Sequence, residues 1–177
     1  ISQKKYVNWK IIQENLGAPW NWENATINPN ITFDIIRENP DKPWNLSKFS
    51  KNPNITIDII RENTDISWDW SEISKNPNIT WNTIRENPDM PWSWKDVYYN
   101  PNISLDIIRD NPDIDWCWNL ISFDKDKKQL IKIVRDNPNK SWNWFIISRN
   151  PEFIIDIIRE NPDKPWDWNE ISCNRNI

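Results

Sequence analysis

The stretch "NPNITFDIIRENPDKPW", residues 28–44, recurs along the chain and contains the signals for one complete helix and for the turn that follows it. A tryptophan closes each copy, at a spacing of 24 residues that is broken once by a step of 26. The closing residues are Trp20, Trp44, Trp68, Trp92, Trp116, Trp142 and Trp166. A fixed period of this size is the signature of a repeat architecture. The sequence therefore predicts a single repeat array over residues 1–177, with about seven units and a two-residue insertion within residues 122–131.

The quoted stretch predicts a short helix with a defined start and end. Thr32 is a candidate N-cap, because its hydroxyl can accept a hydrogen bond from an unpaired backbone N–H of the first turn. Ile31 and Ile36 occupy the two positions of a hydrophobic staple around that cap. Asn39, followed by proline, is expected to end the helix in the left-handed conformation, which asparagine tolerates.

A second short helix is predicted after each closing tryptophan. In "SWDWSEIS" Asp69 is an N-cap and Glu72, three residues later, completes a capping box. The equivalent cap positions hold Asn21, Asn45, Asp69, Ser93, Cys117, Asn143 and Asp167, and Cys117 alone lacks a typical capping side chain. Trp70 and its equivalents lie one residue into this helix and are expected to face the neighbouring unit, although Leu46 takes that place once.

Helix pairs this short are unstable alone, because nucleation is costly and one pair buries little apolar surface. Stacking of successive pairs buries a continuous core. The sequence therefore predicts an all-α fold, and within that class an α-solenoid (superhelix) of about seven 24-residue helix-turn-helix repeats. The closing tryptophans are interpreted as core residues whose indole N–H groups reach a carbonyl or water.

Composition narrows the setting of this array. The net charge is -4, and no apolar run approaches the ~20 residues that a membrane span needs. Cys117 and Cys173 stand at non-equivalent places two repeats apart, which is too far for a disulfide if units stack at roughly 10 Å. We therefore expect a soluble, intracellular protein with no disulfide framework and no membrane partner.

The sequence offers little for catalysis. Histidine is absent, which removes the commonest general base and metal ligand. Two cysteines without histidine make no zinc site at a standard spacing. Repeated carboxylates have similar environments, whereas paired catalytic acids need environments that separate their pKa values. We expect no enzyme, no catalytic residue, no metal site and no cofactor.

One arginine returns in each repeat after the first, which has Gln13 there. The set is Arg37, Arg61, Arg85, Arg109, Arg135 and Arg159. Repeat proteins can bind single-stranded RNA through side chains at equivalent positions. Each of these arginines, however, precedes Glu or Asp and is expected in the last turn of its helix, where it favours the helix dipole. A structural ladder between repeats is the favoured interpretation, and nucleic-acid binding is the weaker alternative.

The triplets "NIT" and "NIS" form a second repeated motif, and they are formal glycosylation acceptors. Their asparagines are Asn30, Asn54, Asn78 and Asn102. The turn, staple and cap roles of the three residues explain the pattern without a glycan. The sequence therefore favours a structural role for them.

The segment "SFDKDKKQLIKIVRDN", residues 122–137, departs most from the repeat pattern. Charged residues replace the usual "NPN", and the helix is expected to begin near Asp124 or Asp126 and to run about one turn longer. The basic residues of this segment are Lys125, Lys127, Lys128 and Lys132. Two interpretations stay open, a diverged repeat with a solvated helix start and a surface that docks a partner.

The pattern "W-x-W-x-x-I-S-x-N-P-N-I-T-x-D-I-I-R-E-N-P-D-K-P" resembles the tryptophan-rich short helical repeats of proteins from giant DNA viruses of the mimivirus type. The resemblance covers nearly the whole chain and implies a viral repeat protein of unassigned activity, located in the host cytoplasm or the virion. It supplies no catalytic or ligand-binding residue. Together with the residue patterns, it favours a non-catalytic scaffold for protein–protein interaction. The main alternative is a structural protein that assembles end to end into a filament or virion component.

Overall fold

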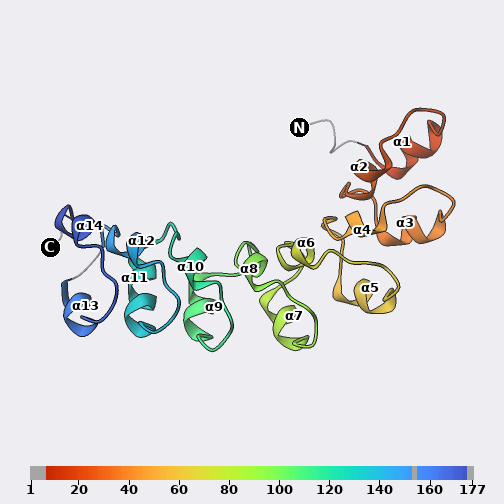
Figure 1. The fold of residues 1–177 in the computed structure, drawn as a ribbon. Coiled ribbons are helices and arrows are strands. Elements are labelled where there is room, and N and C mark those ends of the chain that lie inside the picture. Colours follow the sequence, from red (N-terminus) through yellow and green to blue (C-terminus); the bar gives the residue numbers. More distant parts are fainter. Residues whose placement is uncertain (1–6, 153–154, 175–177) are drawn as a thin grey trace. The chain divides into compact units, whose positions relative to one another are not determined.

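The protein is described by a computed structural model that covers residues 7–152 and 155–174. Within these ranges the chain forms fourteen helices and no strand, which confirms the predicted all-α class (Figure 1). The helices are α1 (Trp9–Glu14), α2 (Trp22–Thr26), α3 (Phe33–Glu38), α4 (Leu46–Phe49), α5 (Ile57–Glu62), α6 (Trp70–Ser74), α7 (Trp81–Glu86), α8 (Trp94–Val97), α9 (Leu105–Asp110), α10 (Trp118–Ile121), α11 (Lys127–Asp136), α12 (Trp144–Ser148), α13 (Ile155–Glu160) and α14 (Trp168–Ser172). In the described part of the chain, no helix has both the length and the apolar character needed to cross a membrane.

The chain divides into two compact units, Ile1–Ile103 (unit 1) and Ser104–Ile177 (unit 2). In unit 1, the even-numbered helices of successive repeats pack on each other, as in the pairs α2–α4 and α6–α8. In unit 2, α12 packs on α14, and α9 packs on α11. Each unit thus contains two rows of helices, one odd-numbered and one even-numbered (Figure 1). The prediction of one uninterrupted array stays a prediction.

The helix starts follow the predicted capping pattern closely. The Thr32 hydroxyl accepts from the backbone N–H of Ile35 at 3.4 Å, and Thr56 and Thr80 make the equivalent contact. In the second helix of each repeat the capping side chain accepts a bond at all of the predicted positions except Cys117, as expected, and Ser93. The Ser93 hydroxyl instead donates to Asp96 Oδ2 at 2.5 Å.

The predicted left-handed helix end is wrong. Asn39 has φ of -131° and ψ of 57°, and no non-glycine residue in the described ranges has a positive φ. The asparagine side chain closes the helix instead, because its Nδ2 donates to the carbonyl oxygen of Ile35 at 2.8 Å. This contact satisfies a carbonyl of the last turn that has no partner within the helix. An αL residue is therefore unnecessary.

The closing tryptophan completes the same helix end. Trp44 Nε1 donates to the carbonyl oxygen of Asn39 at 2.9 Å, which confirms that the indole N–H reaches a carbonyl. All seven repeats contain this bond, from Trp20, Trp44, Trp68, Trp92, Trp116, Trp142 and Trp166 to the asparagine five residues earlier. The helix end, the turn and the tryptophan therefore form one bonded structure in every repeat.

The first asparagine of "NPN" connects neighbouring repeats, a role that the sequence did not reveal. Asn52 is fully buried, and its Nδ2 donates to the carbonyl oxygens of Thr26, Asn28 and Ile31 at 2.7, 3.0 and 3.0 Å. Its Oδ1 accepts from the backbone N–H of Asn54 at 2.9 Å. Equivalent residues repeat this contact in unit 1, and we call Asn52, Asn76 and Asn100 the asparagine ladder.

The second asparagine of "NPN" is the formal glycan acceptor, and its amide is also used within the fold. Asn54 Nδ2 donates to the carbonyl oxygens of Pro29 and Ile31 in the preceding repeat at 2.8 and 3.2 Å. Asn78 and Asn102 make similar bonds. A glycan on these nitrogens would remove hydrogen-bonding capacity between repeats, which supports the structural interpretation of the motif.

The second tryptophan of "W-x-W" packs against the next repeat, as predicted, at Trp22, Trp70, Trp118 and Trp144. Trp70 meets Trp92 edge to face, with ring centroids 5.3 Å apart and planes at 87°. Trp22 with Trp44 and Trp118 with Trp142 show the same T-shaped arrangement, which is a favoured geometry for aromatic pairs. Leu46 cannot make such a contact.

Candidate protein-interaction surface

The irregular segment forms the longest helix among the described residues. Helix α11 (Lys127–Asp136) has 10 residues, whereas α5 (Ile57–Glu62) has 6, which confirms the predicted extra turn. Asp126 is its N-cap and accepts from the backbone N–H of Gln129 at 2.9 Å, within the predicted starting region. The extension thus begins at the charged triplet that replaces "NPN".

One side of α11 is anchored in the core of unit 2. Leu130, Ile131, Ile133 and Val134 are all buried, with at most 4% of any of these residues exposed to solvent. Burial of four aliphatic side chains stabilises the helix by roughly 6 to 12 kcal/mol before conformational entropy is subtracted. The helix is therefore a fixed support for the side chains on its other side.

The predicted docking residues lie at the start and on the outer side of this helix. Lys125, Lys128 and Lys132 are exposed and Lys127 is half-buried. Within the described residues, none of the four ammonium groups lies within 4.0 Å of a carboxylate oxygen. These four residues are called the lysine surface below.

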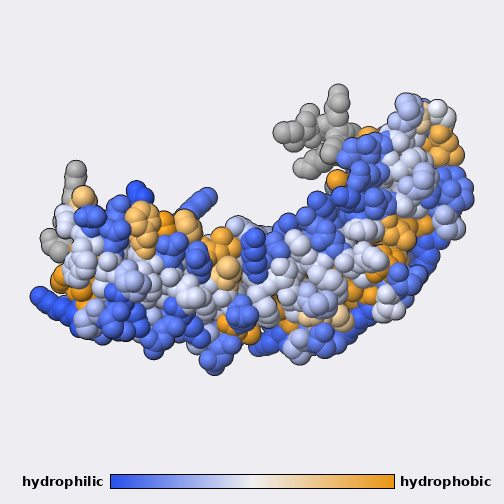
Figure 2. Space-filling view, viewed as in Figure 1, coloured by the Kyte–Doolittle hydropathy of each residue, from blue (hydrophilic) through white to orange (hydrophobic). Residues whose placement is uncertain are grey.

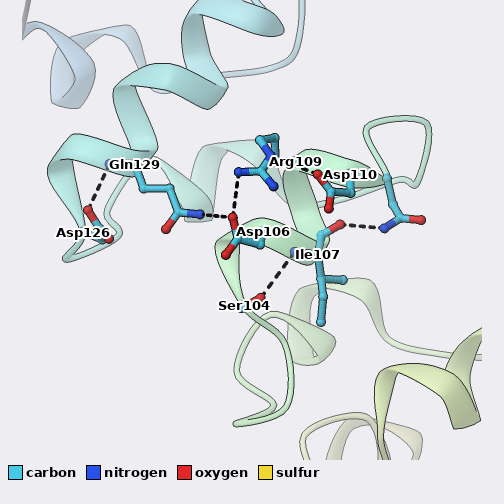
Figure 3. Close-up of polar contacts among 8 residues, drawn as sticks. Ser104, Asp106, Ile107, Arg109, Asp110, Asp126 and Gln129 are labelled. Carbon is cyan, nitrogen blue, oxygen red and sulfur yellow. Dashed lines mark hydrogen bonds and ion pairs between the residues drawn. The ribbon is translucent and has the colours of Figure 1, made fainter.

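A set of polar contacts joins α9 to α11 beside the lysine surface (Figure 3). Arg109 pairs with Asp106 at 2.7 Å and with Asp110 at 2.9 Å. Gln129 Nε2 donates to Asp106 Oδ1 at 2.8 Å and so links the two repeats. The hydrogen bond and the negative charge of Asp110 raise the pKa of Arg109 above its usual value, with a smaller contribution from Asp106. The guanidinium is thus held in place and its charge is locally balanced.

A shallow cavity of 290 Å³ lies over these contacts. It is lined by Asp106, Arg109, Asp126, Lys128, Gln129 and Lys132. Small-molecule sites are mostly apolar and usually larger than this. Every lining side chain here is polar or charged, so the surface can form ion pairs and hydrogen bonds with a partner but offers little apolar area. The sequence indicated the lysines, but Asp106 and Gln129 are 23 residues apart and nothing in their local sequence indicated their contact.

The repeated arginines do not share one set of contacts. Arg37 pairs with Asp34 at 2.7 Å in its own helix, and Arg159 does the same with Asp156 at 3.2 Å. Arg135 makes two bonds to Glu160 of the next repeat, at 2.9 and 3.0 Å. Arg85 lies 3.4 Å from Asn82 Oδ1. Within the described residues, Arg135 is the one member of the set with an ion pair between repeats.

Cysteine and acidic residues are not grouped in this structure. Cys117 is half-buried and Cys173 is exposed, and both are free cysteines. In the described ranges, no three residues of the types His, Cys, Asp and Glu lie together in a way that could hold a metal ion.

Comparison of the chain with protein-family models, curated proteins and solved structures finds no significant match.

Proposed function

We propose that this protein is a non-catalytic α-solenoid whose stacked repeats present a surface to a protein partner. The hydrogen bonds between successive repeats of unit 1 support this proposal, because Asn52, Asn76 and Asn100 each donate to carbonyl oxygens of the repeat before. The resemblance to giant-virus repeat proteins extends the proposal to a viral protein that acts in the host cytoplasm or the virion.

The lysine surface is the proposed docking position on unit 2. The carrying observation is that the four lysines, of which Lys125 precedes the firmly anchored helix α11 and the other three lie on it, have no ion-pair partner among the described residues. Most lysines of unit 1 do have one. Unpaired charges on a fixed support attract a partner of opposite charge and fix its orientation. The proposed partner therefore presents an acidic segment.

The repeated arginines give nucleic acid less support. Phosphate binding requires positive charge that is free to replace counterions. Arg37, Arg109 and Arg159 are instead paired with aspartates of their own helices. A protein partner is for this reason the preferred proposal.

The test combines solution mass with partner capture. We expect light scattering after size exclusion to give one monomer mass over a wide concentration range. The protein with Lys125, Lys127, Lys128 and Lys132 all changed to Gln should lose its acidic partners in capture from cells of the source, with a decrease of at least about tenfold in bound partner.

The matched control changes Lys10, Lys48, Lys51 and Lys75 to Gln, which alters the net charge equally but affects lysines that already have ion pairs. This control should retain the partners. A mass that rises with concentration would contradict the adaptor proposal and favour end-to-end assembly. Equal capture by both variants would exclude the lysine surface as the docking position.

A further inference from the structure

Two neighbouring cavities lie between successive repeats of unit 1. The first has a volume of 320 Å³, and its apolar lining includes Phe33, Trp44 and Leu46. The second has a volume of 500 Å³, and its apolar lining includes Trp68, Trp70 and Met90. Ile66 lines both cavities. We call the pair the unit 1 groove, and hydrophobic surface is visible between the hydrophilic residues around α3 and α5 in the space-filling view (Figure 2).

The two cavities are formed by equivalent residues of consecutive repeats. Trp44 of the first corresponds to Trp68 of the second, and Leu46 corresponds to Trp70, each 24 residues apart. The lining arginine, Arg61, likewise corresponds to an arginine of the first cavity. The groove therefore offers the same kind of site twice, one repeat apart.

The tryptophans of the groove present apolar ring surface to a ligand and little polar capacity. The indole N–H groups of Trp44 and Trp68 already donate to the carbonyl oxygens of Asn39 and Asn63, at 2.9 and 3.0 Å. An aromatic floor of this kind suits aliphatic or proline side chains.

Positively charged side chains outnumber negatively charged ones in the lining of the groove, whereas the whole chain has a negative net charge. Arg37, Lys42 and Arg61 line the cavities against a single acidic residue, Asp65, whereas the chain has a net charge of -4. Arg37 is paired with Asp34, and Lys42 is paired with Asp41. Arg61 has no ion pair within 4.0 Å in the part of the chain that the structure describes. Among the three lining cations, Arg61 is therefore the one that can pair with a carboxylate of a ligand.

The spacing of the cavities points to an extended polypeptide. Stacked helices are about 10 Å apart, so equivalent cavities are separated by about that distance. A polyproline II chain rises ~3.1 Å per residue and has three residues per turn. Residues i and i+3 of such a chain therefore lie on one face about 9 Å apart, close to the spacing of the cavities.

We propose that the unit 1 groove binds an acidic, proline-rich segment of a partner protein in the polyproline II conformation. Two apolar side chains at i and i+3 enter the two cavities, and a flanking carboxylate pairs with Arg61. This inference shares the general class of the proposed function, protein binding, but uses a surface separate from the lysine surface.

The probe is a fluorescein-labelled peptide, Glu-Glu-Leu-Pro-Pro-Leu-Pro-Glu-Glu, and its binding to the full chain is followed by fluorescence polarisation. Ile66→Glu places a carboxylate in the lining of both cavities and should weaken binding of the acidic probe at least about tenfold. The fold should be kept, because Ile66 is half-buried and the equivalent position of the preceding repeat holds the charged Lys42. Arg61→Gln introduces the residue that Gln13 provides in the first repeat, and it should weaken binding about threefold to tenfold. Arg159→Gln is the matched control in unit 2 and should have no effect.

Further probes separate this inference from charge attraction alone. Moving the second leucine to i+4, or replacing the four glutamates with glutamine, should weaken binding by at least about fivefold. Full binding by Ile66→Glu, or failure of the probe to bind the unaltered chain, would overturn the groove. Loss of peptide binding in the Lys-to-Gln variant of the lysine surface, with Ile66→Glu unaffected, would assign the peptide to that surface. This outcome would keep the proposed function and reject this inference.

Discussion

The repeat that contains α5 and the repeat that contains α11 connect to their predecessors in different ways. In the first, residues 50–56 link the two helices, and the buried Asn52 donates to three carbonyl oxygens of the preceding repeat. In the second, residues 122–126 form a shorter link, and Asp124 stands at the position of Asn52. Asp124 keeps the local contact, because its Oδ1 accepts from the backbone N–H of Asp126 at 2.8 Å. A carboxylate has no N–H, however, so Asp124 cannot donate to carbonyl oxygens of the preceding repeat as Asn52 does.

The difference shows two means of stacking a repeat. The repeat with α5 uses directional hydrogen bonds to buried carbonyls, and these fix its register. The repeat with α11 uses an additional helical turn, residues 127–130, which buries Leu130. Hydrophobic contacts fix the position of a repeat less strictly than hydrogen bonds do. They also leave the residues that link α10 to α11 available for surface charges. The lysine surface occupies this region.

The largest effect is expected from exchanging the amide for a carboxylate in the regular repeat. Asn52→Asp keeps the bond to Asn54 N–H but removes both amide hydrogens and places a negative charge beside three carbonyl oxygens. The free energy of unfolding of the chain should fall by about 3 to 5 kcal/mol. Urea denaturation followed by tryptophan fluorescence measures this change.

The reverse exchange in the irregular repeat provides the matched comparison. Asp124→Asn should change the free energy of unfolding by less than about 1 kcal/mol, since the half-buried side chain lies outside the regular ladder. A loss as large as that of Asn52→Asp would show that both repeats depend equally on this position.

An intermediate effect is expected at the closing tryptophans, which the two regions share. Trp68→Phe and Trp142→Phe each remove an indole N–H that donates to an asparagine carbonyl, at 3.0 and 2.7 Å. Each substitution should cost about 1 to 2 kcal/mol of unfolding free energy, because one carbonyl loses its donor and some ring area is lost. Thermal unfolding of the two variants tests whether the helix end is equally important in both regions. A cost confined to one of them would contradict a common role.

The smallest effect is expected from a surface ion pair between regular repeats. Glu72 accepts from Lys51 of the preceding repeat and from Lys75, both at 3.1 Å. Partial burial opposes ionisation of Glu72, but hydrogen bonds and charge from Lys75 and Lys51 outweigh it and hold its pKa below the usual 4.5. A lowered folded-state pKa means that the stabilisation is present above the unfolded value and is lost as the pH falls through the folded value.

Glu72→Gln should therefore lower the unfolding free energy by less than about 1 kcal/mol at neutral pH. The difference from the unaltered chain should disappear at a pH well below the folded value. Denaturation of both proteins at the two pH values measures it, and a difference that persists in acid would assign the effect to packing.

Local signals predicted the helix starts and the packing of the second tryptophan on the next repeat, whereas the polar contacts between repeats could not be predicted. Thr32 was predictable because capping depends on a hydroxyl and an N–H three residues away. The end of the helix at Asn39 was predicted correctly, but the backbone conformation of Asn39 was not. An asparagine can close a helix either with a left-handed backbone or with a side-chain hydrogen bond, and the sequence does not distinguish the two. The three acceptors of Asn52 lie 21 to 26 residues away and belong to backbone groups, which have no sequence signature. The lysine surface was visible as a departure from the repeat, but the unit 1 groove depends on how consecutive repeats approach each other.

The sequence order of the ladder has a consequence for chemical ageing. Asparagine is converted to aspartate when the backbone nitrogen of the following residue attacks the side-chain amide, and this reaction needs an N–H on that residue. Asn52, Asn76 and Asn100 are each followed by proline, which has no backbone N–H. The following proline therefore blocks this conversion of asparagine to aspartate at the three positions. The same change, as Asn52→Asp, is expected to destabilise a repeat most. The proline that shapes the turn also protects the amide, so the repeats can remain in register over the lifetime of the protein.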